Sequence, residues 1–121
     1  MRREQRLRRR QDFAAAYRKG RVQSNQLLVV RVLENSGGPT RFGFVAGKVV
    51  GGAVVRNRTK RRLREIAREA GAREGLDIVV GARKPAATAE FQALRKALVS
   101  LMKRAGALAE TPPAPRSQEN P

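Results

Sequence analysis

The sequence predicts an α/β sandwich formed by one domain, residues 1–110, followed by a Pro-rich tail at 111–121. Three segments place apolar residues at helical spacing, and extended, β-branched runs lie between them. The chain has 121 residues, of which 40% are hydrophobic, enough for one modest core but not for two. We therefore expect a helix, two or three strands, a basic helix, a strand and a final helix, with one face of the sheet covered by helices. The tail holds four of the six prolines and no core residue, so we expect it to be disordered.

The first half of the chain predicts a short helix followed by a small antiparallel meander. In "QDFAAAYRKG", Phe13, Ala16 and Tyr17 lie at i, i+3 and i+4, and Gly20 follows as a stop signal. The run "RVQSNQLLVVRVL" is extended and β-branched, the turn "ENSGGPT" follows it, and "RFGFVAG" predicts the next strand. The segment "KVVGGAVV" carries paired glycines, which favour a plain turn over a phosphate cradle, and we expect a loop there.

A basic amphipathic helix is predicted from Arg56 to about Ala70. Its apolar residues fall at i, i+3, i+4 and i+7 counted from Leu63, which makes a stripe that faces the core. Gly71 or Gly75 is expected to end it. If this helix joins two parallel neighbouring strands, it forms a crossover, for which right-handedness is the general rule.

The last part of the domain predicts a strand and a helix. The run "LDIVVGA" is typical of a buried strand, and "RKPA" turns the chain away from it. Thr88 is placed to cap a final helix, whose apolar positions keep helical spacing from Phe91 to Ala105.

The charge of the chain indicates a polyanionic partner. Lys and Arg number 27 against 10 Asp and Glu, a net charge of +17, and 21 of the 27 are Arg. Arginine pairs with phosphates and stacks on bases, so nucleic acid is favoured over a membrane surface. No apolar run approaches the roughly 18 residues of a spanning helix, and no apolar stretch follows the basic N-terminus as a secretory signal requires. The absence of Cys suits a reducing compartment, so we expect a cytoplasmic protein without membrane contact.

The side chains offer little for catalysis by the protein itself. There is no His and no Cys, so the usual general base, the thiolate nucleophile and both soft metal ligands are missing. The carboxylates are scattered along the chain, and Glu65 and Glu69, one helical turn apart, are best explained as charge relief among arginines. We therefore expect no catalytic residue, no metal site and no small-molecule substrate.

The stretch "RNRTKRRLRE" is the strongest candidate for a binding surface. On a helical wheel of the predicted helix from Arg56 to about Ala70, the polar positions Asn57, Arg61, Arg64 and Arg68 fall within about 60° of one another, away from the apolar stripe. A merely solvated face would intersperse acids, and it would not begin with cations that each cost about 0.3–1 kcal/mol against the helix dipole. These cations therefore predict phosphate contacts, whereas Asn57 fits equally well a role in organising the start of the helix.

The sequence leaves open the roles of two other groups. Phe13 and Tyr17 fit core packing, and they also fit a stacking surface for unpaired bases. Arg83 and Lys84, at the end of a strand, fit a second contact with nucleic acid and equally fit ordinary solvation.

The segment "GFVAGKVVGGAVVRNRTKRRLRE", with "DFAAAYRKG" upstream and "DIVVGARKP" downstream, resembles the bacterial ribonuclease P protein subunit over roughly residues 5 to 105. The resemblance implies an α+β, two-layer sandwich of order α-β-β-β-α-β-α, with a four-stranded mixed sheet and a left-handed crossover through the basic helix. It also implies a ribonucleoprotein endonuclease that removes the leader of precursor tRNA. In this family the RNA subunit, with magnesium, is the catalyst, and the protein is a cofactor that binds that RNA and the leader.

The resemblance and the wheel together give the expected site residues. Contacts with the catalytic RNA are expected from Lys48, Arg56, Asn57, Arg58, Lys60, Arg61, Arg64 and Arg68. Contacts with the leader are expected from Phe13, Tyr17, Leu28, Arg31 and Arg83. The chain departs from the family pattern at Gly47, where a serine is usual, and at Val49, where a second lysine is usual, so Lys48 alone keeps that basic role. The alternatives are a structural ribosomal RNA-binding protein without an associated enzyme and a DNA-binding protein of the nucleoid type.

Overall fold

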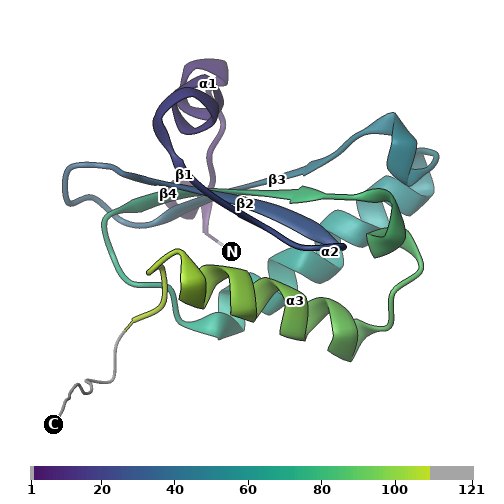
Figure 1. Cartoon of the computed structure of the whole chain (residues 1–121). Coiled ribbons are helices and arrows are strands. Elements are labelled where there is room, and N and C mark those ends of the chain that lie inside the picture. The colour runs from purple at the N-terminus through teal and green to yellow at the C-terminus, as the bar shows by residue number, and fades with distance from the viewer. Residues whose placement is uncertain (1, 110–121) are drawn as a thin grey trace, which may run out of the picture.

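The structure, a computed structural model, describes residues 2–109, so the predicted disordered tail lies outside it. The helices are α1 (Arg10–Lys19), α2 (Ala53–Ala70) and α3 (Phe91–Arg104), and the strands are β1 (Arg21–Ser24), β2 (Leu28–Glu34), β3 (Arg41–Ala46) and β4 (Leu76–Ala82). Short 3-10 turns η1 (Arg3–Gln5), η2 (Lys48–Val50) and η3 (Lys84–Ala87) connect them. The strands form one sheet in the order β1-β2-β4-β3 (Figure 1), which confirms the predicted α/β class and the mixed four-stranded sheet.

The predicted antiparallel meander is wrong, because the two strands on either side of the turn "ENSGGPT" do not pair with each other. The run from 21 to 33 breaks into two antiparallel strands at Asn25, whose side-chain oxygen accepts hydrogen bonds from the amides of Leu27 (3.0 Å) and Leu28 (2.9 Å). β3 does not pair with β2. Both β2 and β3 pair with β4, β2 antiparallel and β3 parallel, because β4 is the strand with two buried faces and takes a central place in the sheet.

The chain passes from β3 to its parallel neighbour β4 through α2, so the predicted crossover is present. Its left-handedness stays a prediction of the resemblance.

Helices lie on both faces of the sheet rather than on one. α2 and α3 cover one face, where Leu63, Ile66, Leu94 and Leu98 pack against the strands, and α1 lies on the opposite face (Figure 1). α1 has a narrow apolar stripe and buries only Ala16 completely. It therefore covers only part of its face, and apolar and polar groups of β1 and β2 stay accessible beside it.

The ends of two helices differ from the prediction. α2 begins at Ala53, three residues before Arg56, with Gly52 as its N-cap, so the segment expected to be a loop contributes the first turn. It ends as predicted at Gly71, which adopts the left-handed conformation at φ 77°. Thr88 does not cap α3: the N-cap is Glu90, and Thr88 instead closes η3. Among residues 2–109, no helix combines the length and apolar character needed to cross a membrane.

Candidate nucleic-acid interface

The helix α2 separates its core side from its charged side as the sequence predicts. Leu63, Ile66 and Ala67 are buried against the sheet and α3. Away from that side Asn57, Arg58, Arg61 and Arg68 are exposed, and Lys60 and Arg64 are half-buried. We call these six residues the basic face of α2. Arg56 is also half-buried, but it lies two turns before Leu63 and therefore on the same side of the helix as the apolar stripe.

The cations of this face have no acidic partner within residues 2–109. The five ion pairs found there involve arginines of the N-terminal segment and of the strands and the α2–β4 loop, and none involves α2. Glu65 and Glu69 are exposed on the same helix but make no ion pair in the described part of the chain. Within the described part of the chain, the positive charge of α2 is therefore not neutralised by ion pairs.

Two arginines in the middle of α2 also contact the protein. Arg62 turns toward α3, where its Nη2 donates to the Ala89 carbonyl at 2.8 Å and its guanidinium lies 5.9 Å from the Phe91 ring centroid. Arg64 lies on the β3 side, 5.8 Å from the Phe44 ring centroid. Arg62 thus fastens α2 to the start of α3, whereas Arg64 keeps part of its guanidinium accessible at the edge of the sheet.

Lys48, the remaining residue expected to contact the RNA, is exposed on η2 at the entrance to α2. Its neighbour Val49 is 67% exposed. The structure therefore extends the accessible basic surface by one lysine beyond the start of the helix.

A second candidate surface lies where α1 crosses the sheet. The Arg31 guanidinium stacks over the Tyr17 ring, 4.4 Å from its centroid, and Tyr17 remains 46% exposed. Val22 lies opposite Arg31 in the β1–β2 register and is 50% exposed, and Val29 shares the same face of β2. We call Tyr17, Val22, Val29 and Arg31 the α1–sheet surface.

Phe13 and Tyr17, which the sequence could not assign, have different environments. Phe13 is half-buried against Leu7, Val45 and Val79, so it anchors α1 to the sheet. Its ring lies over Gly43, where a Cβ would come within 2.5 Å of the Phe13 Cζ. Phe13 therefore belongs mainly to the small core under α1, and Tyr17 is the accessible aromatic ring of this helix.

Leu28 is not a cleft residue, and that prediction is wrong. Its side chain is fully buried in the main core, on the face covered by α2 and α3. Side chains of a strand alternate between faces, so Leu28 and Arg31, three residues apart, must point in opposite directions. The residue that accompanies Arg31 is Val29, which this period of two would have identified. Arg83 is exposed beyond the end of β4, where its amide donates to the Leu27 carbonyl (2.8 Å).

A partly buried group of ion pairs fixes α1 relative to the sheet. Arg41 on β3 donates to both carboxylate oxygens of Asp77 on β4, Nε to Oδ1 at 2.9 Å and Nη2 to Oδ2 at 2.7 Å. Its Nη1 also lies 3.4 Å from the Asp12 carboxylate on α1. The hydrogen bonds to Asp77 raise the pKa of the Arg41 guanidinium above its ordinary value. Arg41 therefore joins β3, β4 and α1 as a permanent cation.

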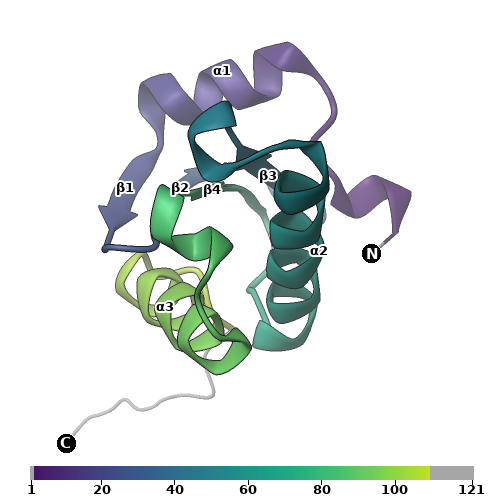
Figure 2. The same cartoon turned by 90° about the vertical axis from the view of Figure 1, so that its right-hand side faces the viewer.

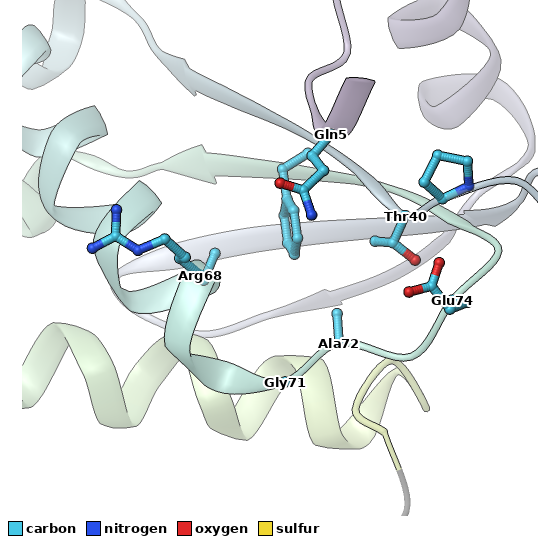
Figure 3. Close-up of a pocket in the computed structure, with 9 residues that line it drawn as sticks. Gln5, Thr40, Arg68, Gly71, Ala72 and Glu74 are labelled. Carbon is cyan, nitrogen blue, oxygen red and sulfur yellow. The ribbon is translucent and has the colours of Figure 1, made fainter. Parts of the chain in front are cut away.

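The hollow at the C-terminal end of α2 holds about 180 Å³ and is shown in Figure 3. Its lining has one cation, Arg68, and one carboxylate, Glu74. No cluster of three or more His, Cys, Asp or Glu side chains suited to a metal ion occurs within residues 2–109. The cations of α2 suit phosphate pairing, and the exposed Tyr17 ring suits base stacking.

Comparison with known proteins identifies the family. The family model "Ribonuclease P" matches residues 1–106. The chain belongs to the ribonuclease P protein family. The ribonuclease P protein component of Symbiobacterium thermophilum is 46% identical over 111 residues, covering 89% of this chain and 96% of the relative.

Solved structures agree. The ribonuclease P protein of Staphylococcus aureus matches with a TM-score of 0.77 at 29% identity, covering 87% of this chain and 98% of that one. The ribonuclease P protein of Thermotoga maritima matches with a TM-score of 0.74 at 35% identity, covering 82% and 96%. The chain is accordingly the protein component of a ribonucleoprotein endoribonuclease and has an RNA partner. A ribosomal protein without an associated enzyme is not favoured.

Proposed function

We propose that this ribonuclease P protein is a noncatalytic cofactor that binds the catalytic RNA through the basic face of α2 and the leader of precursor tRNA through the α1–sheet surface. The observation that carries this proposal is the unpaired charge of α2, whose cations have no ion-pair partner in the described part of the chain. We place this activity in the cytoplasm, a reducing compartment that suits a chain without Cys.

On the basic face of α2, Arg and Lys pair with backbone phosphates and release condensed counterions. Such contacts give affinity with steep salt dependence and little sequence discrimination. They also screen the repulsion between the RNA and its substrate, so the two approach each other at lower magnesium concentration. In this proposal magnesium acts through the RNA subunit, and the protein supplies no ligand to it.

On the α1–sheet surface, Tyr17 and Arg31 can supply the two interactions that bind single-stranded RNA, base stacking and phosphate pairing. An aromatic ring that is 46% exposed can stack on an unpaired base, an interaction of about 1–3 kcal/mol. The guanidinium beside it can pair with a phosphate while it keeps its contact with the ring. Val22 and Val29 add apolar area next to this pair.

The test uses the intact protein, a bacterial ribonuclease P RNA and a precursor tRNA at limiting magnesium, with leader cleavage as the readout. We expect the protein to stimulate cleavage, and the absence of stimulation would refute the proposed function. In the same assay Arg61→Ala with Arg68→Ala should reduce the stimulation. The matched control is Arg95→Ala with Lys96→Ala on the exposed side of α3, which removes the same charge from another helix. Equal losses in both pairs would show that net charge, not the basic face of α2, is responsible.

A further inference from the structure

A second group of cations lies in the segment that precedes α1, for which no role is predicted above. An open hollow of about 620 Å³ is lined by Arg3, Glu4, Arg6, Arg8, Arg9, Asp12 and Arg41. We call Arg3, Arg6, Arg8 and Arg9 the N-terminal arginine cluster. All four are exposed, and none takes part in an ion pair within residues 2–109.

The two carboxylates of this hollow have other partners. Glu4 lies 3.9 Å from the Arg2 guanidinium, and Asp12 lies 3.4 Å from Arg41. Arg41 is itself held by both oxygens of Asp77, so the hollow has a fixed cation at its base. The four arginines of the cluster are thus left without neutralisation, and three consecutive arginines at the start of α1 also oppose the positive end of its dipole.

The segment that carries the cluster is attached to the sheet. Leu7 is buried, and its amide donates to the Phe42 carbonyl at 2.8 Å. Arg6 forms a parallel bridge with Phe42, on the side of β3 that has no neighbouring strand. The arginines on either side of Leu7 therefore have a defined place along the edge of β3.

The cluster is continuous with the basic face of α2. Arg6 lines the 620 Å³ hollow, and it also lines a smaller hollow of about 150 Å³ together with Lys60 and Arg64 of α2. Gln5 and Arg68 both line the hollow of Figure 3. Figure 2 shows the N-terminal segment and α2 on the same side of the molecule, next to the edge formed by β3. Tyr17 and Arg31 line neither of the hollows that Arg6 lines, and Tyr17 belongs to the other end of α1.

We propose that the N-terminal arginine cluster binds backbone phosphates of the ribonuclease P RNA and extends the interface of α2 around the edge of β3. The inference rests on the proposed function, which places that RNA on α2. Guanidinium forks pair with phosphate oxygens through two parallel hydrogen bonds, and the exposed cluster presents four of them. The continuity through Arg6 favours the RNA subunit over the leader, because the leader surface is separated from the cluster by the length of α1.

The experiment measures the affinity of the full chain at several salt concentrations, first for the RNA subunit alone and then for that RNA together with precursor tRNA that carries a leader. Arg6→Gln with Arg8→Gln should lower the slope of log K against log salt by up to about 2 and weaken binding on the order of tenfold at moderate salt. The matched control is Arg95→Gln with Lys103→Gln, two exposed cations of α3, and it should bind as the wild type does. Circular dichroism of each variant verifies that the fold is kept.

Three results would overturn the inference. One is an unchanged slope in Arg6→Gln with Arg8→Gln; another is an equal loss in the α3 control, which would assign the effect to net charge. The third is a loss that appears only with precursor tRNA carrying a leader, which would assign the cluster to the leader. Failure of the proposed function looks different, because the wild-type protein itself would then not bind the RNA subunit.

Discussion

Replacing Gly43 by alanine should displace Phe13 and loosen α1 from the sheet. Gly43 is on β3 directly below the Phe13 ring, and a Cβ there would be 2.5 Å from the ring Cζ, where ordinary contacts are at 3.4–4 Å. The ring therefore has to move by about 1 Å or more, away from Leu7, Val45 and Val79. Backbone strain does not add to the cost of the alanine, because Gly43 is not among the residues with positive φ.

The expected cost follows from the size of this displacement. Overpacking by one methyl group in a well-packed core costs about 1–3 kcal/mol of unfolding free energy. The cost should fall in the lower half of that range, because Phe13 is only half-buried and can shift toward solvent. For a domain of this size, each kcal/mol corresponds to a fall in Tm of roughly 4–8 °C.

Thermal unfolding followed by circular dichroism measures this cost, with Gly47→Ala as the matched control. Gly47 has φ −79° and no heavy atom within 4 Å of an added Cβ, so alanine there should leave Tm almost unchanged. Because Tyr17 is on the same helix, Gly43→Ala should also weaken the preference for precursor tRNA with a leader over mature tRNA. Equal Tm values for the two alanine variants would refute the reasoning that α1 is held on the sheet by packing of Phe13 on Gly43.

Three further predictions concern single contacts. Tyr17→Ala should weaken binding of a precursor tRNA with a leader by about 1–3 kcal/mol and leave the binding of mature tRNA unaffected, as measured by equilibrium titration. Equal losses of affinity for the two tRNAs would mean that Tyr17 only stabilises the fold. Arg61→Ala with Arg64→Ala should lower the salt slope of RNA binding by up to about 2, and an unchanged slope would mean that these arginines are only solvated. Arg41→Met should lower the unfolding free energy in denaturant titrations by roughly 2–3 kcal/mol. It removes two hydrogen bonds to the Asp77 carboxylate and leaves the one from Asn35 Nδ2 (3.0 Å). The Asp77 side chain is 7% exposed and that of Arg41 31%, so solvent already screens part of the pair. Since the pKa of Arg41 is raised, its stabilisation is present below the ordinary arginine pKa and lost only at higher pH, so the deficit should stay constant across neutral pH.

The sequence was most informative where the pattern is local. The stripe of Leu63, Ile66 and Ala67 predicts which side of α2 faces the core, and the structure buries all three. "LDIVVGA" predicts β4 with its observed bounds. A short, mostly apolar run between turn signals is typical of a buried strand. In both cases the structure of the segment depends mainly on residues that are close to one another in the sequence.

Features that depend on distant contacts were missed. The insertion of β4 between β2 and β3 is a property of the whole sheet, and no period in β3 indicates its partner. The N-terminal arginine cluster is assembled by Leu7 pairing with Phe42, 35 residues further along the chain, so composition alone showed only another basic segment. The error at Leu28 was different in kind, because strand alternation in the sequence already excluded it from the face of Arg31.

The adverse charge at the start of α2 is smaller in the structure than in the sequence. Had the helix begun at Arg56, several cations would have stood in its first turn, each at a cost of about 0.3–1 kcal/mol. It begins at Ala53 instead, so Ala53, Val54 and Val55 fill that turn and only Arg56 remains in it. The dipole effect declines within one turn, so the remaining cost for the other cations is their mutual repulsion across solvent. In the proposed complex the phosphate backbone of the RNA would neutralise these cations, so binding at the basic face of α2 would relieve the repulsion that the free helix carries.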